Sequence, residues 1–243
     1  MMKSKENWFK SWFDSPYYHL LYKHRNEEEA LFFITHLIKL FPSGKQSLLD
    51  MACGRGRHSR MFHKMGLEVT GVDLSKNNIA FARKFEAKGL KFMQKDMLIP
   101  MPSKFDLVTN LFTSMGYFPN ASDNWKVIQS MKTNLKVGGY GVIDFLNVNY
   151  AEKLFPSKET KEIDGVQFSI TKTADDSFFY KHIEVDDQGK KFEFIEKLKK
   201  INRSEFEDCI KKEGLELIHV FGNHDLSEFK KNTSKRLILI FKK

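Results

Sequence analysis

The sequence predicts an α/β fold: a doubly wound, mostly parallel seven-stranded sheet with N-terminal helices and a β-rich insertion after strand five. Between residues 46 and 147, short apolar runs alternate with helical patterns, as expected when helices connect the parallel strands of one sheet. From 165 to 201, β-rich runs are separated only by short polar turns, which favours antiparallel hairpins. The chain has 243 residues, 41% of them hydrophobic, and can bury the core of such a domain.

Residues 1–45 are predicted to form a helical cap on the domain. The segment WFKSWF places aromatic side chains four residues apart on one helical face. Asp14-Ser15-Pro16 interrupts this helix, and a second apolar pattern extends to Phe41. Pro42-Ser43-Gly44 is expected to end the cap.

Strands and helices then alternate along the chain. The expected strands are apolar runs bounded by turn residues, at 47–53, 68–74, 91–97, 105–113 and 140–147. The expected helices connect them, at 58–65, from the N-cap Ser75 to Lys88, and from Asn120 to Leu135 with Gly138-Gly139 behind it.

The pattern changes after residue 150. We expect an antiparallel β insertion over 151–201, within a single domain that spans 1–243. Ser204 is then predicted to cap a helix, and Glu207 to complete a capping box. Strands at 215–222 and 236–243 would finish the sheet.

The stretch LLDMACGRGRHSRMF leads from the first strand into its helix and carries two glycines, Gly54 and Gly56. This turn lies at the carboxyl edge of a parallel sheet, where such sheets bind ligands. Glycines let a ligand approach the backbone, and a helix N-terminus offers N–H groups to an anion. The dinucleotide fingerprint Gly-x-Gly-x-x-Gly fails in both registers, because its third position holds Arg57 or Ser59. An NAD-dependent reductase is therefore disfavoured.

The segment Asp50-Met51-Ala52-Cys53-Gly54-Arg55-Gly56 resembles the first motif of the class I S-adenosylmethionine-dependent methyltransferases. That motif reads acid-x-Gly-x-Gly-x-Gly, and Ala52 replaces its first glycine, a mild departure that keeps the turn small. The family expects an acid after strand two, where Asp73 stands, and an acid or polar residue after strand three, where Asp96 stands. The resemblance covers residues 46–147 and implies a Rossmann-like sheet that binds S-adenosylmethionine as its cofactor.

The resemblance implies a task for each candidate residue. Asp50 would act on the amino-acid end of the cofactor, directly or through water, and Asp73 would accept from both ribose hydroxyls. Asp96 would accept from the adenine amino group. The full set of predicted cofactor-binding residues is Asp50, Ala52, Cys53, Gly54, Gly56, Arg57, Asp73, Leu74, Asp96, Met97, Asn110 and Leu111.

Each acid also has a structural interpretation that needs no ligand. Asp50 would then be a buried acid that caps the N–H groups of the loop. Asp73 would simply precede the helix cap Ser75, and Asp96 would be a surface turn residue.

Several side chains outside the motifs are weaker candidates. Residues of the N-terminal segment would either fold over the ligand or pack on the sheet edge: Tyr17, Tyr18, Tyr22 and Arg25. His224 is the one histidine considered as a general base. The catalytic residue is left unassigned, and no histidine spacing indicates a metal site.

The predicted reaction is direct in-line transfer of a methyl group from a sulfonium to a nucleophile, which mainly requires alignment and exclusion of water. Asn110-Leu111-Phe112-Thr113 stands where methyltransferases of planar nitrogens often carry Asn-Pro-Pro-Tyr or Asp-Pro-Pro-Tyr, so we favour a small-molecule acceptor. The net charge of +9 keeps RNA or protein substrates open as alternatives. A non-catalytic S-adenosylmethionine-binding domain is another, and it predicts binding without turnover.

Composition also bears on location. The sequence contains no run of about 18 apolar residues, and its start lacks the apolar segment of a signal peptide. Cys53 and Cys209 do not suggest a disulfide framework. We therefore expect a cytoplasmic protein without membrane association, either a monomer or a homodimer.

Overall fold

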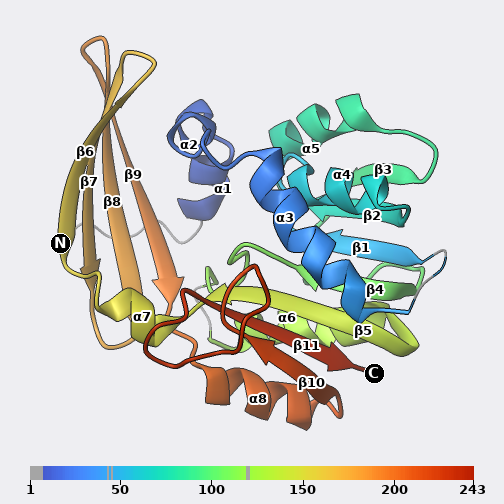
Figure 1. Ribbon diagram of the computed structural model, residues 1–243. Coiled ribbons are helices and arrows are strands. Elements are labelled where there is room, and N and C mark those ends of the chain that lie inside the picture. The colour runs from blue at the N-terminus through green and yellow to red at the C-terminus, as the bar shows by residue number, and fades with distance from the viewer. Residues whose placement is uncertain (1–7, 43, 45, 119–120) are drawn as a thin grey trace.

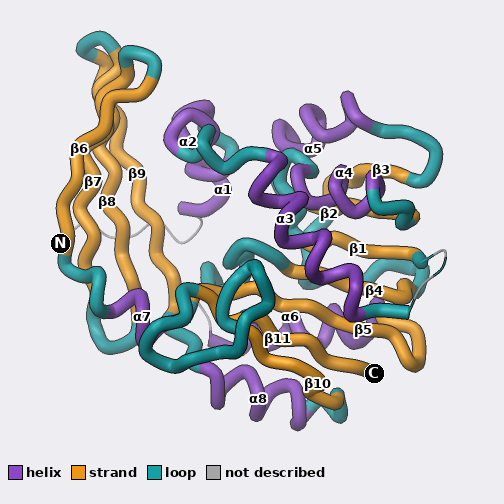
Figure 2. The backbone as a smooth tube through the Cα atoms, in the orientation of Figure 1, coloured by secondary structure: helices purple, strands orange, loops and turns teal. Residues whose placement is uncertain are grey.

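The structure is a computed structural model that describes residues 8–42, 44, 46–118 and 121–243. In this part of the chain, a seven-stranded sheet is covered by helices on both faces, and a four-stranded sheet projects beside it (Figures 1 and 2). The predicted fold class is confirmed. Over the described ranges, no helix combines the length and the apolar character needed to span a membrane.

The large sheet has the strand order β10-β11-β5-β4-β1-β2-β3. Its strands are β1 (Ser47–Met51), β2 (Glu68–Asp73), β3 (Leu90–Gln94), β4 (Phe105–Asn110), β5 (Leu135–Leu146), β10 (Glu216–Phe221) and β11 (Arg236–Lys242). Strands β1 to β5 pair in parallel, whereas β11 is antiparallel to both β5 and β10. The strand order reverses between β1 and β4, so a topological switch point lies at their carboxyl ends.

Two groups of helices cover the sheet and bury separate cores against it (Figure 1). On one face lie α3 (Glu27–Leu37), the 3₁₀ turn η1 (Ile38–Leu40), α4 (Arg57–Lys64), α5 (Lys76–Ala82) and the 3₁₀ turn η2 (Arg83–Phe85). On the other lie α6 (Ala121–Asn134) and α8 (Arg203–Lys212). The strands are apolar on both sides because both faces are covered.

The β insertion is an antiparallel sheet of β6 (Ser157–Ile163), β7 (Val166–Ala174), β8 (Phe178–Asp187) and β9 (Lys190–Lys199), which follows the short helix α7 (Val148–Glu152). One face packs against α1 (Trp8–Phe13) and α2 (Pro16–Leu21), which lie between the two sheets in Figure 1. The insertion and the N-terminal helices therefore share one core. Strand β6 falls outside the β-rich runs of the sequence, because its residues SKETKEI are mostly polar and only pairing with β7 defines it.

The predicted start of α8 is wrong. Its N-cap is Asn202, not Ser204, and its capping box uses Glu205 instead of Glu207. The Asn202 side chain accepts from the Glu205 N–H at 3.1 Å, and the Glu205 carboxylate accepts from the Asn202 N–H at 2.8 Å. Both frames satisfy the sequence rule, and the helix adopts the earlier one.

Other boundaries also differ. The helix capped by Ser75 ends its α-helical part at Ala82 and its 3₁₀ turn at Phe85, short of the expected Lys88. Gly138-Gly139 lie inside β5, which begins at Leu135, and both glycines form backbone hydrogen bonds with Lys243. The expected helix start at Asn120 lies outside the described residues, as does Ser43.

Candidate functional site

A cavity of about 1270 Å³ opens at the carboxyl edge of the large sheet, bounded on the other side by α1 and α2. In the described part of the chain it brings together ten of the twelve predicted cofactor-binding residues: Asp50, Ala52, Cys53, Gly54, Arg57, Asp73, Leu74, Asp96, Met97 and Leu111. Gly56 and Asn110 are not among its described lining residues.

Three residues of the glycine loop adopt left-handed backbone conformations. Gly54 and Gly56 have φ values of 56° and 76°, which glycine accepts at low cost. A Cβ on Gly56 would lie 2.6 Å from the ring of Phe92, so this glycine allows α4 to pack on the sheet. Ala52 has φ 58°, a conformation that costs an alanine about 1–2 kcal/mol. Its departure from the family motif is therefore strained, not mild.

Asp73 forms hydrogen bonds with two segments, the glycine loop and the start of α5. Its Oδ2 accepts from the Gly54 N–H and its Oδ1 from the Ser75 N–H, both at 2.8 Å. Burial raises the pKa of this carboxyl above its ordinary value, and the hydrogen bonds from the two N–H groups oppose that shift. Because a carboxylate has about four acceptor positions, these two hydrogen bonds leave room for further donors from the cavity.

Asp50 is 2% exposed and engages internal hydroxyl groups. Its Oδ2 accepts from Ser59 Oγ at 2.6 Å and its Oδ1 from Thr109 Oγ1 at 3.1 Å. Burial raises the pKa of Asp50 to about 6, against the lowering effect of these two hydrogen bonds. The residue thus combines a structural role with a place on the cavity wall.

The adenine side predicted from the sequence contains both polar and apolar groups. Asp96 Oδ1 accepts from the Leu98 N–H at 2.9 Å, which fixes the turn after β3. Leu74 is 39% exposed and lines the cavity. Burial raises the pKa of the Cys53 thiol, so Cys53 presents a neutral group there. These surfaces suit a flat heterocycle with a polar edge.

Asn110 holds strand ends together instead of lining the cavity. Its Nδ2 donates to the Met51 carbonyl at 3.2 Å, which ties β4 to β1. The Oδ1 atom is buried and has no hydrogen-bond partner within the described residues.

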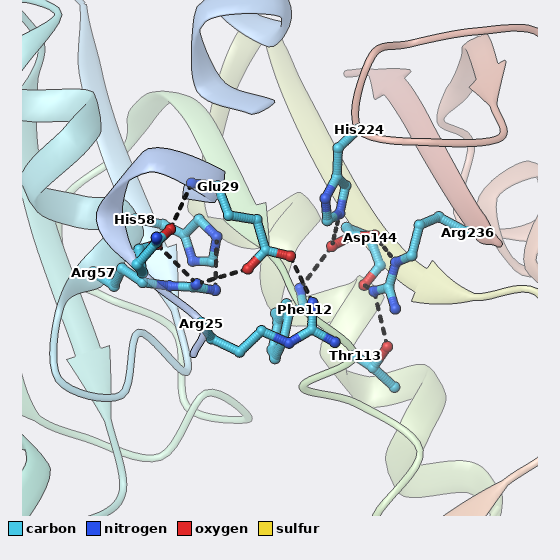
Figure 3. A network of polar contacts seen from close by, with 10 residues as sticks. Arg25, Glu29, Arg57, His58, Phe112, Thr113, Asp144, His224 and Arg236 are labelled. Atoms are coloured by element: carbon cyan, nitrogen blue, oxygen red, sulfur yellow. Dashed lines mark hydrogen bonds and ion pairs between the residues drawn. The ribbon is translucent and has the colours of Figure 1, made fainter. Parts of the chain in front are cut away.

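Arg25 and Arg57 form a positively charged corner of the cavity (Figure 3). Their guanidinium groups bind opposite oxygens of one carboxylate, Glu29, at 2.6 and 3.1 Å. Each also lies 5.0 Å from the ring centroid of Phe112, a cation–π distance. Two positive charges share one negative charge, so the corner favours an anion.

Aromatic side chains form the wall opposite the glycine loop. They come from α1, from α2 and its C-cap Tyr22, and from the loop after β4: Phe9, Phe13, Tyr18, Tyr22, Tyr117 and Phe118. Tyr22 donates to Glu196 at 3.0 Å and accepts from Lys181 at 2.5 Å. Tyr17 is not among the described lining residues, because its hydroxyl bonds Asp187 on the insertion at 2.9 Å.

The histidines at the cavity are poor bases. Burial, reinforced by the charge of Arg57, lowers the pKa of His58 to about 3. Burial and Arg55 lower that of His19 to about 4. His224 is absent from the described cavity lining and stacks on Phe33 with ring centroids 4.5 Å apart. Within the described ranges, no cluster of histidine, cysteine and acidic residues could hold a metal ion.

Sequence reasoning overlooked two kinds of cavity residue. Phe112, Thr113 and Tyr117 lie in the loop after β4, where only Asn110 and Leu111 were predicted to bind the cofactor. Phe9 and Phe13 come from the aromatic run WFKSWF, whose helical spacing signalled only a packed face.

Comparisons with known proteins agree with this geometry. Residues 48–139 match the family model described as a methyltransferase domain. The putative methyltransferase YqeM of Bacillus subtilis is 30% identical over 116 residues, which cover 46% of this chain and 47% of that protein. A dTDP-3-amino-3,4,6-trideoxy-alpha-D-glucopyranose N,N-dimethyltransferase of Streptomyces venezuelae is 30% identical over 112 residues, with coverage of 46% and 47%. The chain thus matches about half the length of these curated relatives.

Solved structures resemble nearly the whole chain. A S-adenosylmethionine-dependent methyltransferase from Clostridium acetobutylicum superposes with a TM-score of 0.78 at 20% identity and covers 93% of this chain and 95% of its own. DesVI of Streptomyces venezuelae gives a TM-score of 0.70 at 24% identity, with coverage of 92% and 95%. Residues 48–139 thus match a methyltransferase domain, and the chain shares the fold of the solved S-adenosylmethionine-dependent methyltransferase from Clostridium acetobutylicum.

Proposed function

We propose that this protein transfers a methyl group from S-adenosylmethionine to a small-molecule acceptor. The observation that supports it is a single cavity, at the switch point of the sheet, that joins ten residues expected for the cofactor to a separate aromatic wall. The N-terminal helices 1–45 and the insertion 151–201 would belong to the same catalytic unit, because both contribute to the core beside the cavity.

The residues present fit this cofactor. Asp73 would hold the ribose diol with its remaining acceptor positions, while Leu74, Asp96 and Met97 would surround the adenine. At the other end, Asp50 would face the amino group and Arg57 the carboxylate. The bound cofactor supplies an activated methyl group on a sulfonium, so the protein has mainly to align the acceptor and exclude water.

The cavity is large enough for a second molecule. Its volume of about 1270 Å³ exceeds the roughly 300–1000 Å³ that is usual for a pocket holding one ligand. The aromatic wall would receive the acceptor, since Phe9, Phe13 and Phe118 offer apolar contacts and Tyr18 and Tyr117 add hydroxyl groups. Burial raises the pKa of both tyrosines, so these hydroxyls keep their protons at neutral pH.

An amine is the acceptor that this chemistry suits best. The two histidines that line the cavity have pKa values lowered to about 3 and about 4, and groups so weakly basic abstract protons poorly at neutral pH. An amine becomes nucleophilic by releasing its proton to water, whereas an alcohol needs a strong base. Two curated relatives carry names of amino-sugar N,N-dimethyltransferases.

Calorimetry comes first: we expect S-adenosylhomocysteine to bind and NADH not to bind. Purified protein with labelled S-adenosylmethionine would then be offered a library of small amines, alcohols and thiols, with RNA and protein extracts in parallel. Transfer to an amine supports the proposal. Binding without transfer to anything would favour a non-catalytic domain, and transfer only to RNA or protein would overturn the small-molecule assignment.

The cytoplasmic location and the monomeric or dimeric state stay predictions. Cell fractionation would test the location, and light scattering at several protein concentrations would test the state.

A further inference from the structure

The turn after β4 contains two adjacent residues in a conformation that their side chains disfavour. Phe112 has φ 61° and Thr113 has φ 57°, in the left-handed region. An aromatic and a β-branched residue rarely occur there, and two in succession persist only when neighbouring groups hold them. Both residues line the cavity. The turn is therefore a strained element at the proposed ligand site.

Asp144 of β5 captures the backbone of this turn. Its Oδ2 accepts from the Phe112 N–H at 2.9 Å, and its backbone carbonyl accepts from the Thr113 N–H at 2.8 Å. Asp144 is 1% exposed. One buried residue thus satisfies both N–H groups of the strained pair.

Arg236 of β11 binds both Asp144 and the turn (Figure 3). Its Nε donates to Asp144 Oδ1 at 2.7 Å, and its Nη2 donates to Thr113 Oγ1 at 2.9 Å. Burial opposes ionisation of Asp144, but the charge of Arg236 and the contact with His224 keep the pKa of the carboxyl below its usual range. The buried acid is therefore charged and paired at neutral pH.

The held turn in turn supports the charged corner of the cavity. The guanidinium groups of Arg25 and Arg57 each lie 5.0 Å from the ring centroid of Phe112, so this one ring contacts both cations. Asp144 and Arg236 are absent from the described lining residues, so any effect they have on a ligand passes through the turn.

We propose that Asp144 and Arg236 are positioning residues for the amino-acid end of the cofactor. They hold the 112–113 turn so that Phe112 keeps Arg25 and Arg57 aimed at a carboxylate in the cavity. This inference rests on the proposed function, because that carboxylate belongs to S-adenosylmethionine or S-adenosylhomocysteine. It assigns a function to a buried ion pair that would otherwise count only towards stability.

The test compares two ligands that differ at that end. S-adenosylhomocysteine carries the amino-acid group, whereas 5′-methylthioadenosine has the same nucleoside without it. We expect Asp144→Asn and Arg236→Lys each to weaken calorimetric binding of S-adenosylhomocysteine about tenfold or more, the loss of one charged contact. Binding of 5′-methylthioadenosine should stay within about twofold of wild type. A purely structural role would weaken both ligands alike.

Two further variants sharpen the result. Arg57→Gln should also weaken binding of S-adenosylhomocysteine more than binding of 5′-methylthioadenosine. The double variant Arg57→Gln, Arg236→Lys should lose less binding free energy than the sum of the two single changes, because both act on one subsite. Asp106→Asn is the matched control: that carboxylate pairs with Lys136 at the opposite edge of the sheet, and both ligands should bind as to wild type.

The outcomes separate the two proposals. If wild type binds neither ligand, the proposed function fails. If wild type binds both, and the variants lose both equally or neither, only the positioning role is overturned. Should Asp144→Asn not fold, Arg236→Lys decides, since it keeps the charge beside Asp144 while removing the bond to Thr113.

Discussion

Asp73 provides the sharpest test of the cofactor site. In Asp73→Asn, one carboxylate oxygen becomes an NH₂ group, which cannot accept a hydrogen bond. Each oxygen of Asp73 now accepts one backbone N–H at 2.8 Å, from Gly54 or from Ser75. The variant therefore leaves one of these N–H groups without its acceptor and removes the charge that a ribose diol would meet.

The magnitude follows from these contacts. A hydrogen bond to a charged group contributes about 1.5–3 kcal/mol, so S-adenosylhomocysteine should bind roughly 10- to 150-fold more weakly. The unpaired N–H should separately lower the free energy of unfolding by about 1–3 kcal/mol. Asp73→Ala removes both acceptors and should cost about 2–4 kcal/mol of binding, by analogy with truncation of other buried charged partners.

Titration calorimetry with 5′-methylthioadenosine and its 2′-deoxy counterpart distinguishes a direct contact from a disturbed loop. If Asp73 accepts from the diol, the loss caused by Asp73→Asn should shrink for the deoxy ligand, since one partner is already missing. A binding loss below about 0.5 kcal/mol, or the same loss for both ligands, would refute the assignment. Asp106→Asn again serves as control.

Three further predictions concern the first strand and its loop. Ala52→Gly should raise the free energy of unfolding, measured in urea, by about 0.5–1 kcal/mol. The reason is that relief of left-handed strain, about 1–2 kcal/mol, exceeds the entropy cost of glycine. A loss of stability would contradict the strain at Ala52. Gly56→Ala should lower the free energy of unfolding by about 2–4 kcal/mol, because the new Cβ would lie 2.6 Å from the ring of Phe92 on a backbone with φ 76°. An unchanged midpoint of urea unfolding would show that α4 can shift to relieve the clash. Burial raises the pKa of Asp50 to about 6 from 3.8. The protonated carboxyl therefore contributes fully to the free energy of unfolding below about pH 4, and this contribution is lost as the pH rises through 6. The loss amounts to up to about 3 kcal/mol. Asp50→Asn should lack that decline, and parallel stability profiles for the two proteins from pH 4 to 7 would count against it.

The sequence by itself determined the parts of this protein that depend on local pattern. Alternating apolar strands and helices predicted the parallel sheet, and parallel strands end at one edge, so Asp50, Asp73 and Asp96 had to stand near each other. Gly56 was predicted to let a ligand approach the backbone; it is absent from the described cavity lining, and its left-handed backbone lets α4 pack on the sheet.

Tertiary structure alone decided what meets those residues. Arg25, Phe112, Asp144 and Arg236 come from four distant segments, and no local period links them. Pairing of β11 with β5 brings Arg236 beside Asp144, and that pairing depends on register across about ninety residues. The strain at Ala52 was equally hidden, because a backbone angle is set by the packing around the loop. Local sequence therefore located the ligand edge, whereas long-range packing selected the side chains that complete it.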